Sequence, residues 1–246
     1  MSLPRLVLLH GFTQTGRSFA PLLPELCRHF DVVAPDLPGH GTRSSMPAGP
    51  GEAARIVAEE GGRGFYLGYS MGGRIALRLA LDRPDLVEGL ILVSTTAGIE
   101  DPEERAARGV ADEAMAASLE AEGLDPFLER WLAQPLFAGL PPQAAGLEAR
   151  RANTAEGLAG ALRLMGQGAF GPVWPRLPEL RMPVLVMAGE HDDAYCQHAL
   201  RLGGWIGETA VLAMVPGAGH ACHLERPEAF LELLVRFLTE HRDDHA

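Results

Sequence analysis

The chain contains no lysine, so all 21 of its basic residues are arginines. Guanidinium groups are therefore the only permanently charged side chains that can bind an anion in this protein, beside backbone amides and histidines. The 32 acidic residues outnumber the basic ones and give a formal net charge of −11. This charge argues against nucleic acid or an anionic membrane surface as the main partner. We expect a small molecule instead, and the sequence leaves the oligomeric state open.

Cysteine and long apolar runs are also scarce. The three cysteines, Cys27, Cys196 and Cys222, are too few and too scattered for a disulfide framework and form no C-x-x-C pair. Residues 1–9 lack the pattern of a signal peptide, and no apolar run reaches the about 20 residues that a membrane-spanning helix needs. These features favour a reducing compartment, and we expect the protein to be cytoplasmic.

Short apolar runs alternate with helical patterns over much of the 246 residues. Continuous apolar runs are typical of strands that are covered on both faces. The alternation predicts an α/β fold with a mostly parallel, doubly wound sheet, in which functional residues lie just beyond the carboxyl ends of the strands. Between the first two strands we expect one helix at about residues 18–29. The predicted strands lie at residues 6–9, 31–35, 65–67, 90–93, 183–187 and 210–215.

Residues 98–178 differ from the rest of the chain. This segment is rich in alanine, glutamate and arginine, shows helical periodicity and contains no convincing strand. We predict a helical insertion that covers the sheet edge as a lid, shapes a pocket and excludes water. Residues 1–97 and 179–246 then form the core, and the lid is not an independent domain.

The strongest local motif is Gly68-Tyr69-Ser70-Met71-Gly72, which fits the G-x-S-x-G nucleophile elbow. It lies between an apolar strand pattern and an apolar helix pattern. The elbow is a strained turn, and side chains at positions 68 and 72 would collide there. Ser70 is therefore predicted at the N-terminus of a helix, where amides and the helix dipole favour developing negative charge.

A serine hydroxyl needs a histidine to take its proton and an acid to orient that histidine. In folds with this elbow the order along the chain is serine, acid, histidine. Ser70, Asp192 and His220 occur in this order, each just after a predicted strand. Asp193 is the alternative acid, and motif position favours Asp192.

Two backbone amides would stabilise an oxyanion in such a site. The natural candidates are the N–H of Met71, which follows the serine, and that of Phe12, which follows the His10-Gly11 turn. His220 and His223 could also suggest a metal site. No third ligand follows with suitable spacing, so we predict no metal.

Taken together, these landmarks resemble the α/β-hydrolase superfamily. The resemblance covers almost the whole chain through LLHGF, DLPGHG, GYSMGG, GEHD and GAGH, in that order. Only nine residues precede His10. The antiparallel strands that usually open this fold are therefore expected to be trimmed away.

The segment 98–178 and the elbow helix narrow the resemblance to a family of menaquinone-pathway lyases, the 2-succinyl-6-hydroxy-2,4-cyclohexadiene-1-carboxylate synthases. No single piece is decisive, but several similar pieces occur in order. They are GYSMGGR at 68–74, ERAAR at 104–108, Trp131 with QPLF at 134–137, RRANTAEGL at 150–158 and MGQG at 165–168.

This resemblance implies a reaction and its ligand. The family eliminates pyruvate from 2-succinyl-5-enolpyruvyl-6-hydroxy-3-cyclohexene-1-carboxylate, a small molecule with three carboxylates, without metal or organic cofactor. Ser70 would then act as a base. Guanidinium groups pair well with carboxylates. The implied substrate-binding residues are Arg74, Arg108 and Arg150, with Trp131 and Tyr69 as pocket walls or packing residues.

Several alternatives remain open at this point. Arg105 and Arg151 compete with Arg108 and Arg150 as carboxylate ligands. The same triad would serve a hydrolase of a small ester or ketone, such as a carboxylesterase or a C–C bond hydrolase, because fold and nucleophile do not determine the reaction. A non-catalytic binding protein on this fold is the third possibility.

Overall fold

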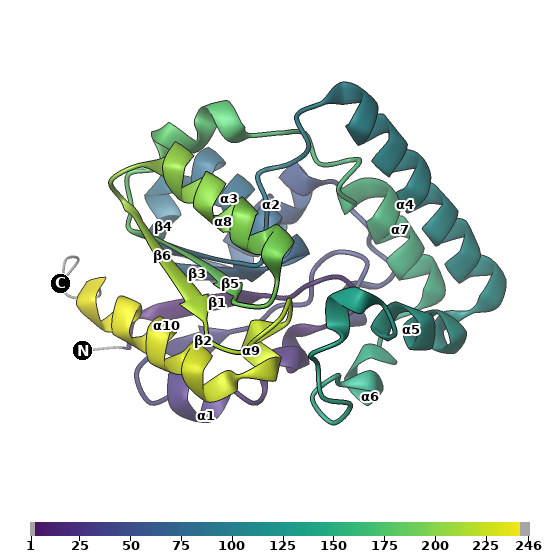
Figure 1. Ribbon diagram of the computed structural model, residues 1–246, viewed down its shortest axis with the longest axis horizontal. Coiled ribbons are helices and arrows are strands. Elements are labelled where there is room, and N and C mark those ends of the chain that lie inside the picture. Colours follow the sequence, from purple (N-terminus) through teal and green to yellow (C-terminus); the bar gives the residue numbers. More distant parts are fainter. Residues whose placement is uncertain (1–2, 242–246) are drawn as a thin grey trace.

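The computed structural model describes residues 3–241 and is built on one six-stranded sheet (Figure 1). The strand order is β2-β1-β3-β4-β5-β6, and all five pairings are parallel. The predicted parallel α/β sheet is therefore confirmed, and no antiparallel pairing occurs within residues 3–241. The strands are β1 (Arg5–Leu9), β2 (Asp31–Val33), β3 (Gly64–Tyr69), β4 (Val87–Val93), β5 (Val184–Gly189) and β6 (Ala210–Val215).

Helices cover both faces of the sheet because the central strands are apolar on both sides. Alternate residues of β1 enter two separate cores, with Leu6 and Leu8 in one and Val7 and Leu9 in the other. The second core lies under α2 (Pro50–Gly61), α3 (Met71–Asp82) and α8 (Asp193–Ile206), and the first lies under α1 (Leu23–Leu26), α9 (Cys222–Glu225) and α10 (Pro227–His241) (Figure 1).

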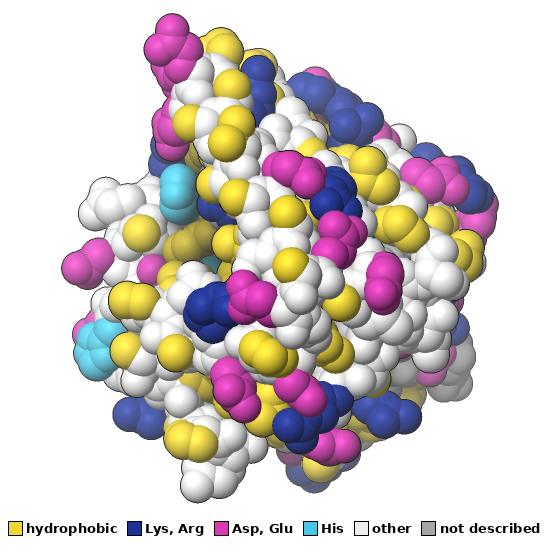
Figure 2. All heavy atoms as spheres, turned by 90° about the vertical axis from the view of Figure 1, so that its right-hand side faces the viewer, with side chains coloured by type: hydrophobic (Ala, Val, Ile, Leu, Met, Phe, Trp, Pro, Cys, Tyr) yellow, Lys and Arg dark blue, Asp and Glu magenta, His cyan; other side chains and the backbone are white. Residues whose placement is uncertain are grey.

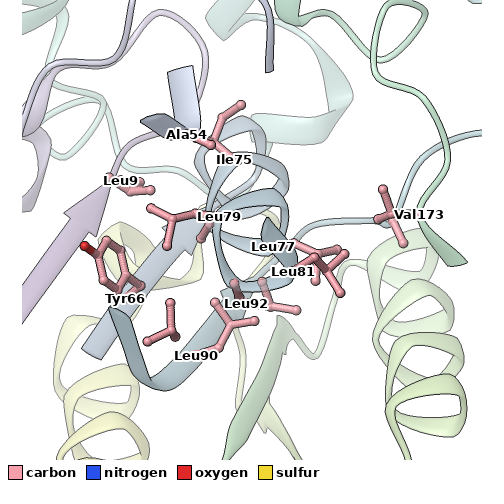
Figure 3. Close-up of a cluster of buried hydrophobic side chains, with 14 of the residues drawn as sticks. Leu9, Ala54, Tyr66, Ile75, Leu77, Leu79, Leu81, Leu90, Leu92 and Val173 are labelled. Carbon is pink, nitrogen blue, oxygen red and sulfur yellow. The ribbon is translucent and has the colours of Figure 1, made fainter. Parts of the chain in front are cut away.

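The elbow helix α3 lies at the centre of one of these cores. Figure 3 shows Ile75 and Leu79 of this helix among buried side chains from β1, β3 and β4. Leu90 and Leu92 of β4 are fully buried beneath it. This packing fixes the start of α3, and with it Ser70, relative to the strand ends.

The prediction of one helix at about residues 18–29 is wrong. A short 3-10 helix η1 (Gly16–Phe19) and the four-residue α1 occupy this stretch instead. Pro21 lies between them, and Pro24 is in the first turn of α1. A proline inside a helix removes a backbone donor and clashes with the preceding turn, so one continuous helix cannot form here.

Between β4 and β5, residues 98–183 form helices joined by loops, with no strand, and the helices up to residue 165 lie beside the sheet rather than over either face (Figure 1). We call residues 98–178 the helical segment. It has a small core of its own, which includes Leu119, Phe127 and Leu158. Its elements are α4 (Pro102–Glu122), α5 (Leu124–Leu132), η4 (Pro135–Phe137), α6 (Leu147–Arg150), α7 (Ala155–Met165) and the start of η5 (Trp174–Glu179). That it acts as a lid stays a prediction.

The face on this side of the molecule carries arginines and acidic residues interspersed with one another (Figure 2). Arg163 of α7, for example, pairs with Glu113 and Glu120 of α4. In the described part of the chain, no helix combines the length and apolarity needed to cross a membrane. The remaining short elements are η2 (Gly41–Arg43) and η3 (Pro84–Leu86).

Candidate active site

Ser70 lies in a left-handed turn between β3 and α3, with φ of +51°. Such a conformation costs a non-glycine residue about 1–3 kcal/mol, so the surroundings must hold it. The Ser70 N–H donates to the carbonyl of Val93, and the Ser70 carbonyl accepts from the Thr95 hydroxyl at 2.7 Å. The flanking glycines are sterically required. A Cβ on Gly68 would lie 2.4 Å from the Gly72 carbonyl, and one on Gly72 would lie 2.2 Å from that of Leu9.

The side chains of Ser70, His220 and Asp192 form a continuous chain of contacts, although they follow three different strands. His220 Nε2 lies 3.4 Å from Ser70 Oγ, and His220 Nδ1 lies 2.7 Å from Asp192 Oδ2. Asp192 and His220 are both buried, whereas Asp193 is exposed at the start of α8. The structure thus brings together Asp192, and not Asp193, with the histidine. This is the arrangement in which an imidazole can take a hydroxyl proton.

Glu225 holds the loop that carries His220, a role that sequence reasoning missed. Its carboxylate is buried and accepts from the N–H of Gly219 at 2.7 Å and that of Ala221 at 3.0 Å. These are the two amides that flank His220. The only sign of this role in the sequence is an acidic residue that lies five positions after His220.

His223 does not face the serine. Its fully buried ring lies 4.4 Å from that of Tyr69 and packs between Phe19 and Phe230, and burial lowers its pKa to about 3. Neither ring nitrogen has a partner among the described residues. Within residues 3–241, no three His, Cys, Asp or Glu side chains are grouped as a metal site.

A cavity of about 410 Å³ opens beside Ser70, and it reaches from the strand ends to the helical segment. Its volume is in the range of small-molecule sites. All the predicted site residues except Asp192 line it, and Asp192 lies behind His220. The predicted residues on the wall are Phe12, Tyr69, Ser70, Met71, Arg74, Arg108, Trp131, Arg150 and His220.

Two of the arginines on this wall are buried charges. Arg74 is 5% exposed and Arg150 is 2% exposed. Burial lowers the pKa of each from 12.5 to about 10, so both remain cationic at neutral pH. Arg74 Nη2 donates to the Met165 carbonyl at 2.8 Å, but its Nε has no partner within the described residues. Arg150 donates to the Ala145 carbonyl and to the Thr13 hydroxyl.

The third arginine, Arg108, comes from α4 and is held by a buried acid. Its Nε donates to Asp112 Oδ1 at 2.7 Å. Arg105 instead bonds the carbonyl of Ile99 at 2.9 Å, and Arg151 pairs with Asp125 on the surface. Neither of these two lines the cavity. Of the open alternatives, the structure brings Arg108 and Arg150 to the serine.

The backbone groups proposed for the oxyanion lie on the same wall. Met71 is the first residue of α3, where N–H groups lack intrahelical partners. Phe12 lies in a tight turn closed by the Gln14 N–H and the Gly11 carbonyl at 3.2 Å. The N–H of Phe12 makes no hydrogen bond within the described part of the chain. His10 supports this turn by accepting from the Leu37 N–H at 2.9 Å.

The remaining wall is largely aromatic. Trp131 lies edge-on to Phe12, with ring centroids 5.2 Å apart, and Tyr69 packs on His223. Tyr195 was missed as a site residue. Its ring lies 4.4 Å from that of His220, and its hydroxyl lies 3.3 Å from Gln167 Nε2. Burial raises the pKa of Tyr195 above its ordinary value, so the hydroxyl that accepts from Gln167 is neutral. Other polar wall residues without a predicted role are Gln14, Gln134 and Gln167.

Comparison with known proteins gives a consistent result. A model of the alpha/beta hydrolase family matches residues 6–233. The 2-succinyl-6-hydroxy-2,4-cyclohexadiene-1-carboxylate synthase of Yersinia pestis bv. Antiqua is 32% identical over 247 residues, which cover 96% of this chain and 88% of the relative.

Two solved structures show the same architecture. MenH from S. aureus matches with a TM-score of 0.91 at 30% identity, covering 98% of this chain and 96% of that one. A thermophilic esterase from Thermogutta terrifontis, solved with malate bound, matches with a TM-score of 0.80 at 26% identity and covers 98% and 91%.

Proposed function

The chain belongs to the alpha/beta hydrolase family, and from its similarity to the synthase of Yersinia and to MenH of S. aureus we propose that it is a lyase of menaquinone biosynthesis. The proposed reaction eliminates pyruvate from 2-succinyl-5-enolpyruvyl-6-hydroxy-3-cyclohexene-1-carboxylate. Its product is 2-succinyl-6-hydroxy-2,4-cyclohexadiene-1-carboxylate, after which the Yersinia relative is named. The ligand is then a small trianion, and the proposal involves no nucleic acid, membrane, metal or organic cofactor.

The observation that carries this proposal is the convergence of three guanidinium groups on the cavity of Ser70. Arg74, Arg108 and Arg150 all line it in a protein of net charge −11. Burying a charge without a counterion is costly, so a buried arginine with a free Nε is expected to meet an anion. A substrate with three carboxylates fits such a cavity, whereas a neutral ester would leave the buried charges of Arg74 and Arg150 without a counterion; Arg108 already has Asp112.

In the proposed mechanism, Ser70 acts as a base. Its hydroxyl proton passes to His220, and Ser70 removes the proton from the ring carbon next to the succinyl carbonyl. The N–H groups of Phe12 and Met71 hold the enolate oxygen as charge develops. The electron pair moves through the ring double bond and breaks the C–O bond to the enolpyruvyl group. The expelled enolate takes up the proton and becomes pyruvate, and Asp192 stabilises the imidazolium in between.

The test is pyruvate release from the purified substrate, followed with lactate dehydrogenase and NADH. We expect turnover by the wild-type protein and a fall of at least about 10³-fold in kcat for Ser70→Ala, since a triad member is lost. Arg151→Ala removes a neighbouring surface arginine and should change kcat/KM by less than about threefold. Absence of pyruvate release, with an active relative as positive control, would contradict the proposal.

A hydrolase is the second candidate. The contact chain of Ser70, His220 and Asp192 is equally suited to acyl transfer, and the matched Thermogutta protein is an esterase. This reading predicts fast turnover of neutral p-nitrophenyl esters that does not depend on Arg74. Labelling of Ser70 by a fluorophosphonate probe would count against a non-catalytic binding protein.

A further inference from the structure

Asn153 joins the helical segment to two loops of the core. It lies between α6 and α7 and is only 4% exposed. Its Oδ1 accepts from the Gly41 N–H at 2.9 Å, in the loop that follows β2. Its Nδ2 donates at 2.8 Å both to the Thr13 carbonyl, in the loop that follows β1, and to the Arg150 carbonyl. Both donor hydrogens of the amide are therefore used, and none faces water.

Thr13 is a residue that needs such support. It is fully buried and has φ of +66°, in the left-handed region that disfavours a β-branched side chain. Within residues 3–241, only Ser70 and Ser94 share this feature among non-glycine residues. The Thr13 carbonyl is held by Asn153 and its hydroxyl by Arg150. Both supports come from the helical segment.

The residue before Thr13 is Phe12, which lines the cavity and whose N–H is the proposed oxyanion donor. The ring of Phe12 also packs into the helical segment, with centroids 5.2 Å from Trp131 and 6.3 Å from Phe127. Two consecutive residues of the turn are therefore held by the same segment. The other proposed donor, Met71, is fixed by α3 and depends on none of these contacts.

We propose that Asn153 is a positioning residue that fixes the Phe12 N–H in the direction required for oxyanion stabilisation. This inference rests on the proposed function only in requiring Ser70 chemistry with an oxyanion, by elimination or by acyl transfer. Without the Asn153 amide, the Thr13 carbonyl loses its donor and the turn relaxes towards negative φ, which rotates the neighbouring peptide groups. The oxyanion site is thereby complete only when the helical segment is docked on the core.

The test compares Asn153→Ala with the wild type by two assays. The first is the second-order rate constant for phosphonylation of Ser70 by a fluorophosphonate, and the second is kcat and KM for pyruvate release or, if that is absent, p-nitrophenyl acetate hydrolysis. Loss of a whole oxyanion donor lowers kcat by about 10²–10³-fold. A misdirected donor should lower kcat and the phosphonylation rate constant by about 10–100-fold, with KM changed by less than about threefold.

Two further variants separate positioning from general stability. Asn153→Asp keeps the side-chain size and the acceptor for Gly41 but, when ionised, has no donor for the Thr13 carbonyl, so it should lose at least as much activity as Asn153→Ala; circular dichroism establishes which variants are folded. Adding Thr13→Gly to Asn153→Ala should restore part of the phosphonylation rate constant, because glycine adopts positive φ without steric cost. Recovery is read from this rate because Thr13→Gly also removes the hydroxyl that accepts from Arg150. Arg151→Ala, two residues away and paired on the surface, is the matched control and should retain wild-type rates.

Equal phosphonylation rates for wild type and folded Asn153 variants would overturn the role of Asn153 and leave the proposed function intact. A change confined to KM, or no recovery of the phosphonylation rate constant with Thr13→Gly, would also overturn it. If the wild type itself neither labels nor turns over either substrate, the proposed function and this inference fall together.

Discussion

Replacing Arg74 by methionine should stabilise the free protein and disable it as an enzyme. Methionine keeps an unbranched, flexible side chain in the space of the arginine but removes the charge. Burial lowers the pKa of Arg74 from 12.5 to about 10, and this direction shows that burying the charge is unfavourable. Each pKa unit is worth about 1.4 kcal/mol, so the buried guanidinium costs the free protein on the order of 3 kcal/mol.

Part of this gain is offset by what the guanidinium does contribute. Its hydrogen bond to the Met165 carbonyl is worth about 1 kcal/mol, and its stacking over Phe170 at 5.8 Å adds a smaller amount. The net stabilisation of Arg74→Met is then about 1–2 kcal/mol. For a chain of this size that is a rise of several degrees in Tm, at about 2–4 °C per kcal/mol.

The catalytic effect has the opposite sign. Truncating one partner of a buried, hydrogen-bonded charge pair costs about 2–5 kcal/mol, which corresponds to a fall in kcat/KM of about 30-fold to several thousand-fold. The measurements are thermal unfolding in anion-free buffer and pyruvate release. Arg78→Met is the matched control, because Arg78 lies one turn further along α3 in a half-exposed pair with Asp82. An Arg74→Met variant less stable than the wild type, or with kcat/KM within threefold of it, would refute this reasoning.

Two further predictions concern the residues around His220. Glu225→Gln leaves only one good acceptor for the two amides that flank His220. We expect kcat to fall about 10-fold or more, with KM nearly unchanged, in steady-state assays. An unchanged kcat would argue against a role of Glu225 in holding the His220 loop. His223→Phe should reduce acid sensitivity. Burial lowers the pKa of His223 in the folded protein to about 3. Below about pH 6.5, His223 is therefore protonated in the unfolded chain but stays neutral in the folded one. The contribution of His223 to the free energy of unfolding is therefore fully present above this pH and is lost as the pH falls. At pH 5 the loss is about 2 kcal/mol. Denaturant unfolding at pH 8 and pH 5 should show that the free energy of unfolding falls about 2 kcal/mol less in the variant than in the wild type. Equal losses would be inconsistent with a neutral, buried imidazole.

The fold was predictable where local patterns decide it. Continuous apolar runs bounded by turns predicted the strands, because a strand covered on both faces admits few polar residues. The wrong helix at residues 18–29 had a visible warning in Pro21 and Pro24. The apolar periodicity of this stretch predicts a helix, but the two prolines restrict the backbone and interrupt it.

The candidate site was predictable where it depends on strand ends and on sterics. Glycines at positions 68 and 72 and the order of Ser70, Asp192 and His220 are features of the chain itself. The choice between Arg105 and Arg108 was not, because residues three apart lie on the same side of a helix and periodicity cannot separate them. Asn153 was beyond prediction for a different reason, since its partner Thr13 lies 140 residues away.

The position of β6 at the edge of the sheet has a consequence for thermal inactivation of this protein. Within residues 3–241, β6 has a single neighbour in the sheet, β5. Its Val211 and Leu212 are 47% and 41% exposed, whereas β3 is buried along its whole length. The nucleophile thus follows a fully buried central strand, whereas the imidazole follows an edge strand, where local unfolding begins. Warming would separate Ser70 from His220 while most of the molecule is still folded. Activity would therefore be lost below the temperature of global unfolding and would return on cooling.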